Sequence, residues 1–227
     1  MRYFTPTSTA EMVFSDTKTK QLLTDILCHN VSFPSHGKNC LMLFGVYGSG
    51  KTTYSKIFFD EYEKSFNGNG ANVKEIFVDD NTKITTTIGT LNNIANLIPL
   101  HNHSDKHYFM FDEFDNLNEE QQTRLKHFLN RQNIICIMTT NNLHKIDKGI
   151  LSRSYIINCN ASLNISNYVV RMRQILIQNN LPILDEKTLE NIAKQSNGSW
   201  REMGSLLEQC CSRVSAGFVK KTILKIV

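Results

Sequence analysis

The octapeptide GVYGSGKT, residues 45–52, restricts the fold of this chain more than any other stretch. It fits the pattern GxxxxGK[ST] at every fixed position, and it stands between an apolar run at 39–45 and an amphipathic stretch at 51–66. A strand that turns through glycines into a helix presents backbone N–H groups and the positive end of the helix to phosphate oxygens. The stretch therefore predicts a phosphate-binding loop (P-loop) and an α/β fold to hold it.

Short apolar runs and helix-length stretches alternate through the first two thirds of the chain. Besides the run at 39–45, candidate strands lie at 73–80, 107–113, 133–140 and 154–160. The amphipathic stretches between them lie at 51–66, 84–98 and 118–131. Because strands that alternate with helices form parallel sheets covered on both faces, we expect a three-layer αβα domain with a five-stranded parallel sheet.

The strand signal stops near residue 160, and only helical patterns follow it. They lie at 163–180, 186–196 and 200–216. The sequence therefore predicts two parts, an α/β nucleotide-binding domain over 1–160 and a small all-helical lid domain over 161–227.

Composition bears on the compartment and on the partners. The six cysteines form no CxxC pair, no apolar run approaches the roughly 18 residues of a membrane span, and the first residues lack the apolar core of a signal peptide. We expect an intracellular protein that is not secreted and does not cross a membrane, cytoplasmic or, in a host with a nucleus, nuclear. A net charge of +4 permits contact with nucleic acid but does not demonstrate it.

The P-loop supplies most of the candidate nucleotide ligands. Its glycines let backbone N–H groups curl around phosphate oxygens, Lys51 is expected to reach the β and γ phosphates of ATP, and Thr52 is expected to bind Mg²⁺. The candidate nucleotide-binding residues of this loop are Gly45, Val46, Tyr47, Gly48, Ser49, Gly50, Lys51, Thr52 and Thr53.

A second motif, YFMFDEFD at 108–115, places two acids at the end of an apolar strand. Ligands of open α/β sheets bind at the carboxyl ends of the strands. Asp112 is therefore expected to hold Mg²⁺, and Glu113 to polarise the water that attacks the γ-phosphate. The alternative is a pair of solvated acids that open a loop.

The run IICIMTTNN at 134–142 ends the next strand in polar residues. Asn141 is the candidate there for sensing the γ-phosphate during hydrolysis, with Thr140 and Asn142 beside it. The alternative is ordinary loop chemistry, since asparagine commonly follows strands.

Taken in order, these motifs resemble those of the AAA+ ATPases. Within that family they look like clamp loader subunits, of the replication factor C small-subunit type and the bacterial DNA polymerase III gamma and delta-prime type. The family's Ser-Arg-Cys motif is represented by Ser152-Arg153-Ser154, and its lid motif Gly-Asp-x-Arg by Gly198-Ser199-Trp200-Arg201. The segment YFTPTSTAEMVFSD, residues 3–16, is similar to the one that cups adenine.

The resemblance implies a shared ATP site. It implies that Arg153 acts in trans, on the ATP of a neighbouring subunit, and that Arg201 contacts ATP from the lid of its own subunit. It also implies a homo- or hetero-oligomeric ring or spiral, a pentamer or hexamer. The alternative for Arg153 is a surface pair with an acid such as Asp147.

The resemblance also implies DNA as a partner, contacted through its backbone, in primed or single-stranded form, together with a sliding clamp or a helicase. The family places DNA contacts at a helix start, where this chain has Lys83, Thr85, Thr86 and Thr87. The alternative is that these threonines simply cap the helix.

Two departures from clamp loader subunits are expected: no helical collar domain follows the lid in this sequence, and the segment after the second strand, with Lys83 and Thr85–Thr87, differs from the family's. We expect an ATP-hydrolysing, clamp-loader-like protein that couples ATP turnover at subunit interfaces to remodelling of DNA or a replication partner. The alternatives are a helicase loader, a transposition or packaging accessory ATPase, and a module that holds ATP to bind a partner without hydrolysing it.

Overall fold

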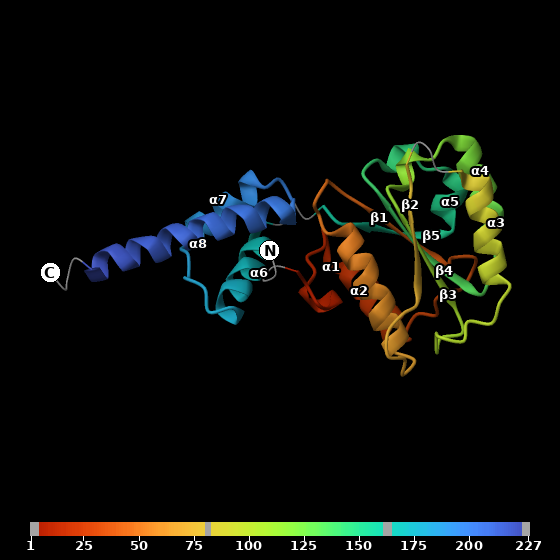
Figure 1. The fold of residues 1–227 in the computed structure, drawn as a ribbon, viewed down its shortest axis with the longest axis horizontal. Coiled ribbons are helices and arrows are strands. Elements are labelled where there is room, and N and C mark those ends of the chain that lie inside the picture. Colours follow the sequence, from red (N-terminus) through yellow and green to blue (C-terminus); the bar gives the residue numbers. More distant parts are fainter. Residues whose placement is uncertain (1–4, 80–82, 161–164, 224–227) are drawn as a thin grey trace.

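The computed structural model describes residues 5–79, 83–160 and 165–223, with side chains up to residue 214. An α/β part with a central sheet and a helical part lie at opposite ends of the view in Figure 1. The expected residues 3–4 of the adenine segment, Asp80 of the second strand and the start of the lid at 161–164 lie outside the described residues.

Five strands form one parallel sheet, as the alternation of strands and helices predicts. They are β1 (Cys40–Phe44), β2 (Val73–Phe77), β3 (His107–Asp112), β4 (Ile134–Thr140) and β5 (Ser154–Asn158). Their spatial order is β2-β3-β4-β1-β5, and every neighbouring pair is parallel. All carboxyl ends therefore meet at one edge of the sheet, and all amino ends meet at the opposite edge.

Helices cover both faces of this sheet (Figure 1). α1 (Thr17–Leu27) and α2 (Lys51–Lys64) pack on one face, and α3 (Ile84–Ala95), α4 (Glu119–Phe128) and α5 (Lys148–Ser152) pack on the other. The expected three-layer α/β architecture is confirmed.

The side chains of β1 show why both faces are covered. Leu41 and Leu43 belong to the apolar cluster beneath α1 and α2, whereas Cys40 and Met42 belong to the cluster beneath α3, α4 and α5. Because successive side chains of a strand point to opposite faces, an uninterrupted apolar strand needs cover on both.

The helical part contains α6 (Ile165–Gln178), α7 (Glu186–Gln195) and α8 (Trp200–Ile223). These helices share an apolar cluster that includes Tyr168, Met172, Leu189 and Met203. The three expected lid helices are thus present, and the boundary between domains at residue 160 stays a prediction.

Two helices of the structure were not predicted. α1 begins at Thr17 and is capped by Asp16, whose carboxylate accepts a hydrogen bond from the Thr19 backbone N–H. Aspartate is a common N-cap residue, so the sequence does contain a signal for this helix. α5 has only five residues and is capped by Asp147 in the same way. A helix this short carries no periodic apolar pattern, so tertiary packing determines it.

None of the described helices is both long enough and apolar enough to span a membrane.

Candidate nucleotide-binding site

The P-loop follows the carboxyl end of β1 and leads directly into α2. Gly48 and Gly50 adopt left-handed backbone conformations, with φ of 75° and 92°. A Cβ atom at Gly48 would lie 2.5 Å from the hydroxyl of Ser199, so this position needs glycine for its conformation and for the close approach of the lid. Tyr47 stands exposed at the tip of the loop, and the Ser49 hydroxyl is buried without a hydrogen-bond partner among the described residues.

Lys51, the first residue of α2, lies at the centre of the site. Its Nζ donates to the backbone oxygens of Gly45 at 2.8 Å and Val46 at 3.0 Å, and to Oδ1 of Asn141 at 2.8 Å. Burial lowers the pKa of the Lys51 ammonium, although the carboxylate of Asp112 opposes the shift. The structure therefore brings together the P-loop lysine and the expected sensor asparagine from the end of β4.

Asp112 ends β3 and faces the P-loop threonine. Its two carboxylate oxygens lie 3.0 and 3.1 Å from the hydroxyl of Thr52, and the hydroxyl of Thr139 donates to it from β4. Oxygen ligands of this kind suit Mg²⁺, which prefers carboxylates and hydroxyls to nitrogen or sulfur. The residues present therefore fit the ion that the sequence predicts.

Glu113 follows Asp112 in an uncommon backbone conformation. Its φ is 59°, in the left-handed region, and its backbone N–H donates to the Thr139 hydroxyl at 3.0 Å. Its side chain is exposed and accepts a hydrogen bond from Nδ2 of Asn116 at 3.3 Å. Non-glycine residues in this region cost free energy and cluster at functional sites, where the surrounding contacts hold them.

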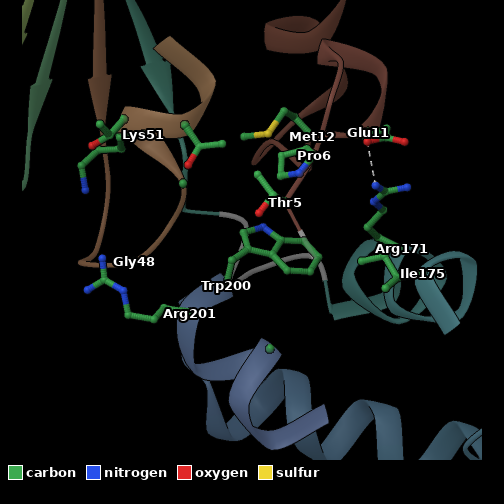
Figure 2. A pocket seen from close by; sticks show the side chains of 14 residues that line it. Thr5, Pro6, Glu11, Met12, Gly48, Lys51, Arg171, Ile175, Trp200 and Arg201 are labelled. Carbon is green, nitrogen blue, oxygen red and sulfur yellow. Dashed lines mark ion pairs between the residues drawn. The ribbon is translucent and has the colours of Figure 1, made fainter. Parts of the chain in front are cut away.

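A pocket of about 250 Å³ continues from the P-loop toward the lid. Figure 2 shows the indole of Trp200 facing Thr5, Pro6 and Met12 across it. Its further lining residues are Glu11, Gly48, Gly50, Lys51, Thr52, Thr53, Arg171, Ile175, Arg201 and Gly204. The N-terminal segment and the lid thus form two apolar walls beside the phosphate loop.

Polar contacts join the lid to the α/β part on both walls of this pocket. The backbone N–H of Arg201 donates to the backbone oxygen of Gly48 at 3.3 Å, and its exposed guanidinium points toward Gly48 (Figure 2). On the other wall, Arg171 of α6 pairs with Glu11 at 3.0 Å. Arg201 therefore lies beside the P-loop, and its contact with ATP stays a prediction.

Arg153 lies at the opposite edge of the sheet from the P-loop. It directly precedes Ser154, which pairs with Cys40 at the amino end of β1, whereas the P-loop begins after Phe44. Five residues of strand span about 16 Å. That is farther than an arginine side chain extends, so Arg153 does not reach the ATP site of its own chain.

The alternative that Arg153 pairs with Asp147 is wrong. Asp147 accepts from Lys126 at 3.2 Å and from the backbone N–H groups of α5. The Arg153 guanidinium instead donates to Oδ1 of Asn130 at 2.9 and 2.8 Å and to the backbone oxygen of Gly149 at 2.7 Å.

The candidate DNA residues lie at the amino end of α3, beyond the carboxyl end of β2. Lys83 is the N-cap residue and is exposed, as are Thr85 and Thr86. The Thr87 hydroxyl donates to the backbone oxygen of Lys83 at 3.2 Å, and no side chain of the described residues caps the helix. The side chains of Lys83, Thr85, Thr86 and Thr87 therefore do not cap α3, contrary to the alternative.

Several residues of the site are indicated by none of the sequence motifs. Thr139 links Asp112 to Glu113, and Asn116 contacts both Glu113 and the backbone oxygen of Val78. Asn160 accepts a hydrogen bond from the Val46 backbone N–H of the P-loop at 2.7 Å. The only signal for Thr139 and Asn160 is their position, since both follow or end apolar strands.

The fold is similar to those of solved AAA+ proteins. Thermotoga maritima RuvB, a Holliday junction branch migration motor, shares 18% identity at a TM-score of 0.62, over 91% of this chain and 64% of that chain. PCH-2 of C. elegans shares 14% identity at a TM-score of 0.60, over 86% of this chain and 62% of that chain. The chain thus spans less than two thirds of either protein, and identities this low show the fold alone.

No curated protein matches the chain in sequence. The family model that does match is that of the ATPase family associated with various cellular activities (AAA), over residues 41–159, more than half of the chain. The chain therefore belongs to the AAA family of ATPases.

Proposed function

We propose that this chain hydrolyses ATP as a clamp-loader-like AAA+ protein that couples ATP turnover at subunit interfaces to remodelling of DNA or a replication partner. The observation that carries the proposal is the position of Arg153, a full strand length from the P-loop of its own chain. An arginine so placed can stabilise a γ-phosphate only in a neighbouring subunit. The ATP site is then complete only in a ring or spiral of subunits, with a pentamer or hexamer as the expected assembly.

ATP binding relies on the P-loop and on the groups that Lys51 already contacts. The backbone N–H groups of the loop and the amino end of α2 receive the phosphates. The Lys51 ammonium, now held by neutral oxygens, gains a charged partner in the γ-phosphate. Thr52 and Asp112 would hold Mg²⁺, which when bound offsets the negative charge of the β and γ phosphates.

Hydrolysis requires a base beside the γ-phosphate, and we assign that role to Glu113. Water attacks the γ-phosphorus, the bond to the β-phosphate oxygen breaks, and the Glu113 carboxylate accepts the proton of the water. Nδ2 of Asn116 donates to this carboxylate, and the hydrogen bond from the Glu113 backbone N–H to the Thr139 hydroxyl holds the backbone that carries it. A base in this position also argues against a module that binds ATP without hydrolysing it.

We expect ATP turnover to be coupled to the subunit interface through the cations that contact the γ-phosphate. Arg201 from the lid and Arg153 from the neighbour would both gain from that charge, so ATP favours a closed interface. Loss of the γ-phosphate removes the shared contact and loosens the interface.

DNA is the proposed partner, bound through the exposed start of α3. The residues just after β2 contact the acidic motif, because the Val78 backbone N–H donates to the backbone oxygen of Asp112 at 3.1 Å and its backbone oxygen accepts from Asn116 at 3.0 Å. The similarity in fold to a branch migration motor is in keeping with this partner.

We expect primed or single-stranded DNA to raise ATPase activity several-fold at low salt. The effect should fade as salt rises, because binding to phosphates releases counterions. Lys83→Ala should weaken the stimulation, while Lys187→Ala, an exposed lysine on α7, should leave it unchanged. A steady-state ATPase assay across a salt series measures this. If DNA has no effect at low salt, the remodelled partner is a protein, as for a helicase loader.

The base of the nucleotide is expected between Trp200 and the N-terminal segment. Trp200 is the only tryptophan of the chain, so ATP binding should change its fluorescence directly. Trp200→Leu should weaken ATP binding about tenfold, in the range of base–aromatic stacking, whereas Trp200→Phe should retain most of the affinity. Titration of intrinsic fluorescence and calorimetry measure both. Unchanged emission on saturation with ATP would place the base elsewhere.

A further inference from the structure

A second pocket surrounds Arg153 at the amino-terminal edge of the sheet. Its volume is about 620 Å³, within the range of small-molecule sites in proteins. Three segments line it, at 34–39, 129–132 and 152–153. It is separate from the pocket between the P-loop and the lid, and the two have no lining residue in common.

Hydrogen bonds hold these segments together. The turn before β1 closes through two backbone hydrogen bonds between Ser35 and Lys38, of 3.0 and 2.8 Å. The buried side chain of Asn39 then donates to the backbone oxygens of Leu129 and Arg131, at 2.9 and 3.0 Å. The walls of the pocket are therefore fixed by contacts between residues about 90 positions apart.

Three cationic side chains line this pocket, and each is held by neutral oxygens. Lys38 donates to the backbone oxygens on either side of Arg153, those of Ser152 at 3.1 Å and Ser154 at 2.8 Å. Arg131 donates through Nε to the side-chain oxygen of Asn92 at 3.2 Å. Together with the contacts of Arg153 to Asn130 and Gly149, these bonds position the cations without cancelling their charge.

No acidic residue is among those that line the pocket in the described part of the chain. The acid near Gly149 is Asp147, and its charge is matched by Lys126. Three fixed cations in one concave site repel one another and produce a positive potential, which a multivalent anion relieves. The charge of this pocket therefore suits a polyphosphate.

We propose that Lys38 and Arg131 act with Arg153 on the triphosphate of the ATP held by the neighbouring subunit. The inference rests on the proposed function, because it requires that Arg153 act in trans. It extends that function from a single arginine to a cationic pocket that receives the phosphates as a group. The DNA phosphates are a less suitable occupant, since the DNA candidates at the start of α3 lie beyond the opposite edge of the sheet.

Mixtures of two inactive variants test the pocket. Arg153→Ala subunits hold ATP but offer no arginine, and Lys51→Ala subunits hold no ATP but offer an intact pocket. Activity in the mixture therefore reports only on the pocket of the Lys51→Ala subunit. We expect that adding Arg131→Gln or Lys38→Gln to that subunit lowers the recovered ATPase rate at least about tenfold, in the range of one lost charged contact.

Two controls separate direct contact from folding or assembly. Arg173→Gln, which removes an exposed arginine on α6, should leave recovery unchanged. Light scattering should detect the same mixed oligomers for every pair. Calorimetry with inorganic tripolyphosphate on the Lys51→Ala protein gives an independent readout, and Arg131→Gln should weaken that binding at least about tenfold.

The outcomes distinguish the inference from the function on which it rests. If Lys51→Ala alone restores no activity to Arg153→Ala, the trans arginine itself is wrong. Lys51→Ala subunits that also carry Arg131→Gln or Lys38→Gln are compared with Lys51→Ala alone. If all of them restore the same ATPase rate, the cationic pocket is wrong while the proposed function stands. A loss that occurs only when DNA is present would assign the pocket to DNA and overturn the inference.

Discussion

Arg153→Ala should lower ATP turnover by about 10³-fold, the effect typical of an arginine finger, and change ATP affinity only modestly. The backbone at Arg153 lies about 16 Å from the P-loop of its own chain, measured along β1, so we expect the side chain to add nothing to nucleotide binding there. Its charge matters in the transition state of the neighbour. Steady-state ATPase rates at saturating ATP, together with calorimetric affinities, measure the two effects.

Asn130→Ala is the matched control for Arg153. It removes the side-chain acceptor of the arginine but keeps the charge, so turnover should fall only a few-fold. Recovery of activity on mixing Arg153→Ala with Lys51→Ala should depend on total protein concentration, because the interfaces form by association. Mixed oligomers without activity would refute the trans role and much of the clamp-loader-like proposal.

Lys51→Ala should abolish measurable ATP binding, while Glu113→Gln should bind ATP like the parent and lose turnover by about 10³-fold. The lysine contacts phosphates in the ground state, whereas the glutamate acts on water only as the transition state forms. Nucleotide affinity by calorimetry and the rate of phosphate release separate these roles.

Glu119→Gln is the matched control for the glutamate, because Glu119 is an exposed acid of α4 outside the site. It should change neither affinity nor turnover. Equal ATP affinity in Lys51→Ala and the parent would contradict the P-loop assignment, and full turnover in Glu113→Gln would show that another group accepts the proton.

The sequence predicts the parts of the site that one segment builds alone. The P-loop and the acids at the end of β3 each combine a strand with the residues that end or follow it, so the local pattern suffices to find Lys51, Asp112 and Glu113. Asn141 is found for the same reason, because it directly follows a fully buried strand.

The parts that the sequence does not reveal depend on contacts between distant segments. Glu11 and Arg171 are 160 positions apart, and nothing near either residue indicates that they pair across the nucleotide pocket. The cationic pocket likewise joins Lys38, Arg131 and Arg153 from three connections, and of these only the one with Arg153 carries a sequence motif. Only the strand order brings these connections to one edge of the sheet.

The N-terminal segment determines how the lid can move. Met12 and Phe14 belong to the apolar cluster of the sheet, while Val13 between them packs against the cluster of the lid. A rotation of the lid must therefore expose Val13 or withdraw its neighbours. Val13 is partly buried, so exposing it costs less than the roughly 1.5–3 kcal/mol of a fully buried side chain. Small rotations of the lid keep the contacts of Val13 with the lid and those of Met12 and Phe14 with the sheet. Larger rotations break all the contacts of one of these side chains together. The lid should therefore occupy a few discrete orientations rather than a continuous range, so loss of the γ-phosphate changes the orientation of α8 in a step.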